Sequence, residues 1–174
     1  EYHKRLITKS YPSTEILVTG LPTCSAEYRQ GRKWMEKENI VVFPHRLDPE
    51  KQPHIFDDIQ ELYFSKYPDG ETTFFLRTKD VCSTKAAYYD LLAKSKVAFS
   101  SSLQETFGIA MLEAAALGCH PVVPDRISYR ETFKNFPRYS STEEAVILIH
   151  NALSQPPVDY TKYDDAIRSI ISAI

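Results

Sequence analysis

Two glutamates eight positions apart are candidates for chemistry, because one of them lies in an otherwise apolar helix. Residues 108–117 contain only Gly, Ala, Ile, Leu and Met besides Glu113, a composition typical of a helix that is buried on most sides. An isolated buried charge is costly, so Glu113 should be neutralised, hydrogen-bonded, or directed at a polar cavity filled by ligand hydroxyls. Glu105 lies in the loop before this helix and could accept hydrogen bonds from a second polyol.

The start of this helix is a candidate anion site. The first N–H groups of a helix, expected here over residues 107–110, have no intrahelical acceptors and lie at the positive end of the helix dipole. Gly108 has no side chain, so a phosphate could approach its backbone closely. Glu113 would lie just beyond that phosphate, where the ribose of a nucleotide could reach it.

Two cations occupy a charged loop that follows an earlier apolar run. Arg46 and Lys51 come shortly after residues 40–43, which read as a buried strand. Ligands of open α/β sheets bind in the crevice at the carboxyl ends of the strands, so both side chains could stabilise a diphosphate as negative charge develops on it. For an arbitrary pair of cations in a loop, a solvated surface without a role is the commoner outcome.

Apolar runs and amphipathic segments alternate along the chain. Strands are predicted at 15–19, 40–43, 72–77, 97–99 and 120–123, with a last short strand near residue 139. Helices are predicted at 25–39, 53–67, 84–95, 107–117, 142–153 and 160–174. This alternation predicts an α/β fold with a Rossmann-like, doubly wound, mostly parallel sheet. We expect residues 1–14 to be a linker or the end of a preceding domain, residues 15–155 the Rossmann-like domain, and residues 156–174 a C-terminal helix.

The composition restricts the class of protein. The chain has 174 residues, 43% hydrophobic and 25% charged, with a formal net charge of -2, which fits one globular domain without a general cationic field for nucleic acid or membranes. Cys24, Cys82 and Cys119 lack metal-ligand spacing and favour reduced thiols in a cytoplasmic protein. No apolar run approaches the length of a membrane span, and no signal peptide is recognisable. Because the sequence does not begin with methionine, we expect a fragment of a longer protein.

The residues around the two glutamates form a specific motif. An E-x7-E pattern spans ETFGIAMLE and continues as AAALGCHPVV, with a predicted strand on either side. Together these features resemble the C-terminal, donor-binding domain of retaining GT-B glycosyltransferases of family four. The loop HRLDPEKQ is similar to the G-R-L-x-x-x-K-G element of that family, with His45 and Gln52 at the glycine positions. The resemblance covers about residues 40–132.

The resemblance implies a role for each candidate residue. Arg46 and Lys51 would grip the diphosphate of a UDP- or GDP-sugar donor, and Glu105 would contact the transferred sugar, which places these three in the catalytic set. Glu113 would hold the ribose. Backbone amides at the helix start would hold the diphosphate, and the residues assigned to the nucleotide there are Thr106, Phe107, Gly108 and Ile109.

The resemblance also implies the reaction and its partners. The family transfers a sugar with retention of anomeric configuration, and no metal or cofactor is expected beyond the donor substrate, since cations and amides supply the charge. The acceptor site would lie in an N-terminal GT-B domain that is missing from this chain. The strings HR-x4-K and GCHPVVPDRISYRE are similar to the tRNA-queuosine mannosyltransferase-like branch, in which the acceptor is a modified nucleoside.

Other functions remain open on the sequence. The chain is long enough for one of the two domains that a GT-B enzyme closes around its substrates. It could therefore be a non-catalytic module that binds a nucleotide sugar or another protein. A phosphorylase or an epimerase on the same scaffold is a further possibility, although no cofactor lysine of a phosphorylase can be placed.

Overall fold

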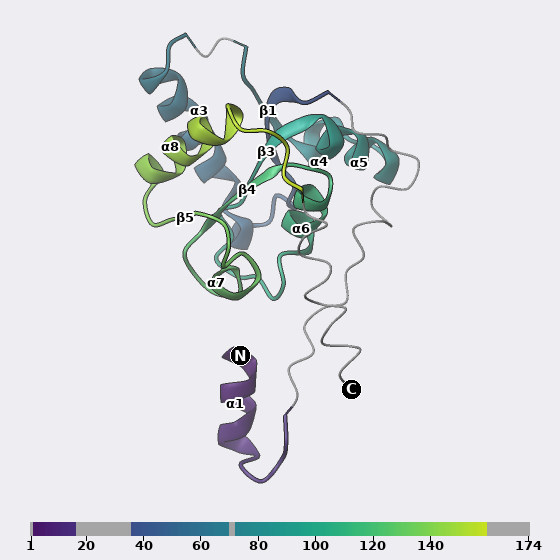
Figure 1. Cartoon of the computed structure of the whole chain (residues 1–174), viewed down its shortest axis with the longest axis vertical. Coiled ribbons are helices and arrows are strands. Elements are labelled where there is room, and N and C mark those ends of the chain that lie inside the picture. Colours follow the sequence, from purple (N-terminus) through teal and green to yellow (C-terminus); the bar gives the residue numbers. More distant parts are fainter. Residues whose placement is uncertain (1, 17–35, 70–71, 160–174) are drawn as a thin grey trace.

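The computed structural model describes residues 2–16, 36–69 and 72–159 (Figure 1). Its helices are α1 (Tyr2–Ser10), α3 (Pro53–Lys66), α4 (Thr78–Val81), α5 (Lys85–Lys94), α6 (Ile109–Ala116), α7 (Tyr129–Thr132) and α8 (Thr142–Leu153), and a 3-10 turn, η1, spans Pro49–Lys51. Its strands are β1 (Glu38–Phe43), β2 (Phe74–Arg77), β3 (Ser95–Phe99), β4 (His120–Pro124) and β5 (Arg138–Tyr139). No described helix has the length and apolar character needed to cross a membrane.

The strands form one parallel sheet in the order β2-β1-β3-β4-β5. Helices connect successive strands, so the predicted α/β, Rossmann-like, doubly wound fold is confirmed. The chain leaves β1 toward β2 on one side and then returns to β3 on the other side of β1. Such a reversal opens a crevice at the carboxyl ends of the two strands, which is the usual ligand site of a doubly wound sheet. In this sheet the reversal lies between β1 and β3.

Alternating residues of the central strands divide the core into two layers. Ile40 and Val42 of β1 pack in the cluster that contains α5 and α6, whereas Val41 and Phe43 pack in the cluster of α3 and α8. Figure 1 shows these helix pairs on opposite sides of the sheet. This alternation is what a strand buried on both faces requires, and it fixes which residues leave β1 at its carboxyl end.

The apolar helix of the sequence is α6, and it is largely buried as predicted. Met111, Leu112 and the three alanines after Glu113 are buried, whereas Glu113 is half-buried. The helix begins at Ile109, two residues later than predicted, because Gly108 adopts a left-handed conformation with φ 74° and serves as its N-cap. The first-turn amides are therefore those from Ile109 onward.

Several predicted element boundaries are wrong or lie outside the described residues. Glu38 and Asn39 belong to β1 and not to the end of a helix over 25–39, because pairing of Glu38 with Ser95 of β3 outweighs local sequence preference. Residues 36 and 37 are not helical either, whereas residues 25–35 of that helix, most of the strand at 15–19, and the helix at 160–174 lie outside the described residues. Residues 72 and 73 precede β2, and α4 was not predicted.

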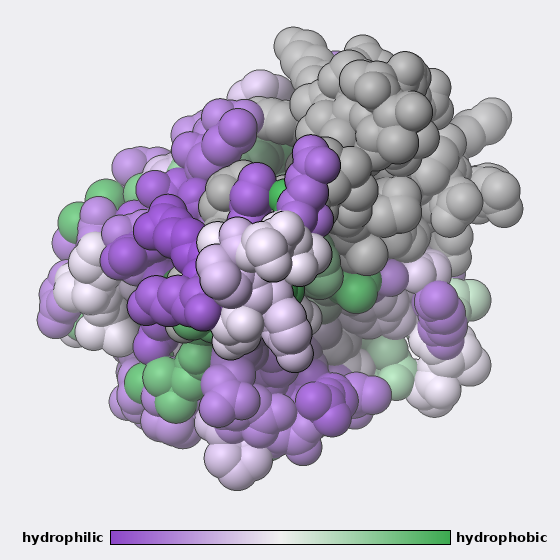
Figure 2. All heavy atoms as spheres, turned by 90° about the horizontal axis from the view of Figure 1, so that it is seen from below, coloured by the Kyte–Doolittle hydropathy of each residue, from purple (hydrophilic) through white to green (hydrophobic). Residues whose placement is uncertain are grey.

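The described surface combines polar and apolar areas. Figure 2, which views the molecule from below the orientation of Figure 1, shows separate hydrophobic areas between hydrophilic ones on its coloured part. Exposed apolar side chains include Leu47, Phe107 and Ile109. Such scattered apolar residues are ordinary on a globular domain.

Candidate functional site

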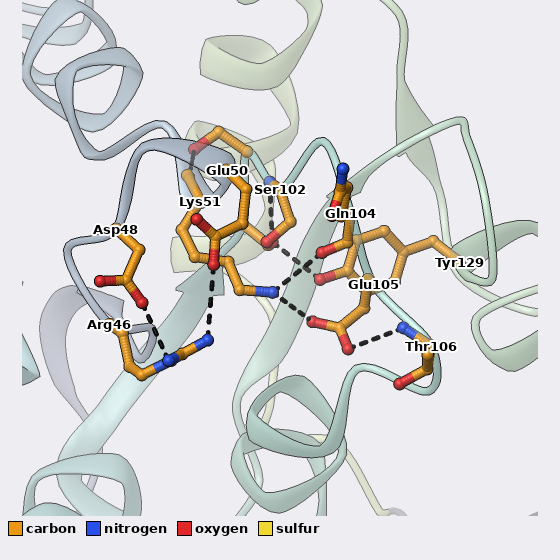
Figure 3. A network of polar contacts seen from close by, with 11 residues as sticks. Arg46, Asp48, Glu50, Lys51, Ser102, Gln104, Glu105, Thr106 and Tyr129 are labelled. Atoms are coloured by element: carbon orange, nitrogen blue, oxygen red, sulfur yellow. Dashed lines mark hydrogen bonds and ion pairs between the residues drawn. The ribbon is translucent and has the colours of Figure 1, made fainter.

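An ion pair between Lys51 and Glu105 joins the two loops at the β1/β3 crevice (Figure 3). Nζ of Lys51 lies 3.0 Å from Oε2 of Glu105, and the two side chains are only 12% and 14% exposed. Lys51 also donates to the backbone oxygen of Gln104 at 2.9 Å. The structure thus brings together two candidate residues that are 54 positions apart in the sequence, as their places after separate strands predict.

The Glu105 carboxylate collects donors from both loops. Its Oε1 accepts a hydrogen bond from the backbone N–H of Thr106 at 3.0 Å. Burial alone would raise the pKa of Glu105, but the Lys51 hydrogen bond, a backbone hydrogen bond from Gly108 and the Lys51 charge lower it overall. Glu105 is therefore ionised at neutral pH and acts as an acceptor. The ammonium and the amides before α6 thus converge on one anionic group.

Arg46 occupies a different position from Lys51. Its side chain is 67% exposed and pairs with Asp48 at 3.0 Å and with Glu50 at 3.4 Å. These partners belong to its own loop, as Figure 3 shows. Exposed ion pairs contribute little free energy, so Arg46 can exchange them for another anion at small cost. The predicted pairing of Arg46 and Lys51 on one ligand stays a prediction.

The start of α6 is fixed by a close approach of Gly108 to Tyr129. A Cβ atom at Gly108 would lie 2.7 Å from Cε1 of Tyr129, a fully buried side chain of α7. Glycine is thus required by the backbone conformation and by the neighbouring ring together. Phe107 and Ile109, on either side, have exposed side chains, so any role of these positions in holding a diphosphate would come from their backbone.

Three buried serines after β3 connect the loops of the site. Oγ of Ser101 lies 2.8 and 2.9 Å from the backbone oxygens of Lys51 and Gln52, which share its single hydroxyl hydrogen. Oγ of Ser100 lies 2.8 Å from the hydroxyl of Tyr129 and accepts from the backbone N–H of Ser102 at 3.3 Å. These bonds fix the loop after β1 against the loop that carries Glu105. The sequence marks the serines only as polar residues after a strand, so their connecting role was not predicted.

Gln52, which stands at a glycine position of the similar family element, adopts a left-handed backbone conformation. Its φ is 51° and its ψ is 57°. A residue with a Cβ is strained there, whereas glycine adopts this conformation readily. The local backbone geometry that suits a glycine is thus present although the side chain is a glutamine.

Replacement of Gln52 by glycine should therefore raise the free energy of unfolding by about 0.5–1 kcal/mol. Glycine relieves the strain of the left-handed conformation, and the greater conformational entropy of glycine in the unfolded chain offsets part of that gain. Urea denaturation measures this change. Gln60, inside α3, provides the matched control, because glycine there should lower stability by roughly 1 kcal/mol. If Gln52→Gly instead lowered the free energy of unfolding, the claim that Gln52 is strained in its left-handed conformation would be contradicted.

Glu113 is held by two tyrosines of α5. The hydroxyl of Tyr88 donates to Oε2 and that of Tyr89 to Oε1, each at 2.8 Å. Burial and the neighbouring carboxylate raise the pKa of Tyr88 far above its ordinary value, so its phenol stays protonated and donates. Of the options open on the sequence, Glu113 thus takes the hydrogen-bonded one. Its predicted contact with a ribose stays a prediction, and its tyrosine partners were not foreseen.

Comparisons with known proteins agree with this architecture. No family model matches the chain. Among curated proteins, the chain is similar to the tRNA-queuosine alpha-mannosyltransferase of Drosophila melanogaster, with 24% identity over 71% of this chain and 38% of the relative. The chain thus spans well under half the length of that relative.

Solved structures of glycosyltransferases share the fold. The chain is similar to a mutant of S. aureus TarM in complex with fondaparinux, alpha-GlcNAc-glycerol and UDP, with a TM-score of 0.58 and 16% identity over 99% of this chain and 39% of that one. It is also similar to AviGT4, a glycosyltransferase involved in avilamycin A biosynthesis, with a TM-score of 0.52 and 16% identity over 93% of this chain and 60% of that one. The chain therefore has the α/β, Rossmann-like fold found in GT-B glycosyltransferases.

Proposed function

We propose that this chain is the donor-binding domain of a retaining GT-B glycosyltransferase of family four, and that it binds a nucleotide diphosphate sugar between β1 and β3. The observation that carries the proposal is the convergence of Lys51, Thr106 N–H and Gly108 N–H on a single carboxylate. Donors that surround one anion at the start of a helix are suited to a phosphate in the same place.

The proposed donor would rearrange these contacts. A diphosphate carries more negative charge than one carboxylate, so it would compete with Glu105 for the Lys51 ammonium. Glu105, still ionised, would then accept hydrogen bonds from hydroxyls of the transferred sugar. Lys51 and the exposed Arg46 would stabilise the charge that develops on the departing diphosphate, which requires neither a metal nor a cofactor.

Glu113 would serve the nucleoside part of the donor. Its carboxylate would exchange one or both tyrosine hydroxyls of α5 for the hydroxyls of a ribose. The acceptor site would belong to a second, N-terminal GT-B domain, in keeping with the share of the relative that this chain spans. By its similarity to the Drosophila protein, the proposed acceptor is a modified nucleoside. The proposed location is the cytoplasm, on the separate ground that the cysteines lack metal-ligand spacing and favour reduced thiols.

Calorimetric titration of the chain with UDP, GDP, UDP-glucose, UDP-N-acetylglucosamine and GDP-mannose tests the proposal. We expect one base to be preferred, with a Kd below about 1 mM, which corresponds to roughly -4 kcal/mol. A folded chain that binds none of these ligands would contradict the donor site. Binding without transfer, after the N-terminal half is supplied, would identify a non-catalytic binding module, and the anomeric configuration of a product would decide retention.

A further inference from the structure

A buried histidine lies beside the Lys51–Glu105 pair. His45 follows β1 by two positions, its residue is only 4% exposed, and its ring meets that of Phe43 edge-on with centroids 5.2 Å apart. Lys51 and Glu105 are the charged groups that act on it. His45 therefore belongs to the same carboxyl end of β1 as the proposed donor site.

One nitrogen of this ring lacks a partner. Nε2 of His45 is closed off from solvent and has no hydrogen-bond partner in the part of the chain that the structure describes. A buried polar atom without a partner is costly, and native proteins contain few of them. An unpaired nitrogen at a proposed binding site therefore points to a partner beyond the described residues, such as a bound ligand.

The protonation state of His45 indicates what that partner can be. Burial, followed by the nearby Lys51 ammonium, lowers the pKa of His45 to about 4, against a smaller opposite effect of Glu105. The ring is therefore neutral at pH 7 and carries one N–H and one bare nitrogen. A bound phosphate would favour an imidazolium, whereas a neutral ring is suited to a hydroxyl, which can both donate and accept.

We propose that Nε2 of His45 hydrogen-bonds a hydroxyl of the transferred sugar, beside Glu105, and so helps to select the sugar of the donor. This inference rests on the proposed function. Because Nε2 is closed off, a neighbouring side chain must shift when the donor binds. Lys51 is the neighbour with a reason to move, since a diphosphate attracts its ammonium more strongly than Glu105 does.

Substitutions of His45 that place a polar atom at different distances from the backbone, or remove it, test this contact. The amide of glutamine extends about as far as Nε2, that of asparagine about as far as Nδ1, and phenylalanine keeps a ring without a polar atom. For each variant, the test compares the Kd of the preferred nucleotide sugar with the Kd of its bare nucleoside diphosphate. His45→Asn and His45→Phe should weaken the sugar nucleotide about tenfold more than the bare nucleotide, and His45→Gln should restore most of the difference.

The outcomes separate this inference from the proposed function. Equal losses for both ligands, or no loss, would overturn the sugar contact and leave a buried water as the partner of Nε2. A wild-type chain that binds no nucleotide would overturn both proposals. Nitrogen NMR shifts of the His45 ring in wild type provide a measurement that does not depend on variant folding. Nε2 should shift on addition of the sugar nucleotide but much less with the bare nucleotide, and equal shifts would contradict the contact.

Discussion

Replacement of Lys51 by methionine is expected to weaken binding of the preferred nucleotide diphosphate about 100-fold. A hydrogen bond to a charged group contributes about 1.5–3 kcal/mol, and 1.4 kcal/mol corresponds to a factor of ten in Kd. The variant also leaves the mostly buried Glu105 carboxylate without the cation that lies 3.0 Å from it. That unpaired charge would repel the diphosphate in addition to the lost attraction. Isothermal titration calorimetry measures the change.

A second lysine–glutamate pair provides the control for this effect. Lys94 lies 3.9 Å from Glu38, with both side chains about half exposed, at the amino end of β1 and away from the crevice. Lys94→Met removes the same charge and should leave the Kd within about twofold, since exposed pairs contribute little. Equal effects of the two substitutions would show that only the overall charge matters, which contradicts a site at Lys51.

Replacement of Gly108 by alanine is expected to lower the free energy of unfolding by about 3 kcal/mol, from left-handed strain and overpacking together. The backbone φ of 74° disfavours a residue with a Cβ. The added atom would also lie 2.7 Å from the ring of Tyr129, whose hydroxyl is tied to Ser100. Urea denaturation followed by circular dichroism measures the loss.

Asparagine at position 108 separates the two causes. It adopts the left-handed conformation more readily than alanine does, but it carries the same Cβ. If the clash with Tyr129 dominates, Gly108→Asn should remain destabilising by more than about 1 kcal/mol. A loss below that value for both variants would mean that the ring moves aside easily and that the start of α6 tolerates a side chain.

The sequence predicted the central strands and the meeting of the two loops because those features follow from local patterns. The apolar runs within β1 and β3 are short and bounded, and residues placed after parallel strands gather at one edge. Lys51 and Glu105 could therefore be brought together without coordinates. The helix predicted at 84–95 is α5, and Thr84 caps its start by accepting the N–H of Ala87 at 3.1 Å, because capping depends on residues close in sequence.

The remaining features depend on distant contacts. The partners of Glu113 are set by the rotation of α5 about its axis relative to α6, and no periodicity in either helix encodes that angle. The helix α4 has four residues, too few for a hydrophobic period to appear. His45 reads in the sequence as a substitution for glycine, and only its burial and its unpaired nitrogen mark it as a candidate for binding.

The buried serines after β3 set how reproducibly the site is assembled. Apolar contacts are non-directional, so a small shift changes their energy little. A hydrogen bond between a hydroxyl and a carbonyl depends on distance and angle and is lost within a fraction of an ångström. Ser101 reaches two such carbonyls through a single side-chain carbon, so there is almost no internal slack to absorb a shift. The backbone therefore sets the spacing between Lys51 and Glu105. A longer side chain at position 101 would change that spacing without altering either charge.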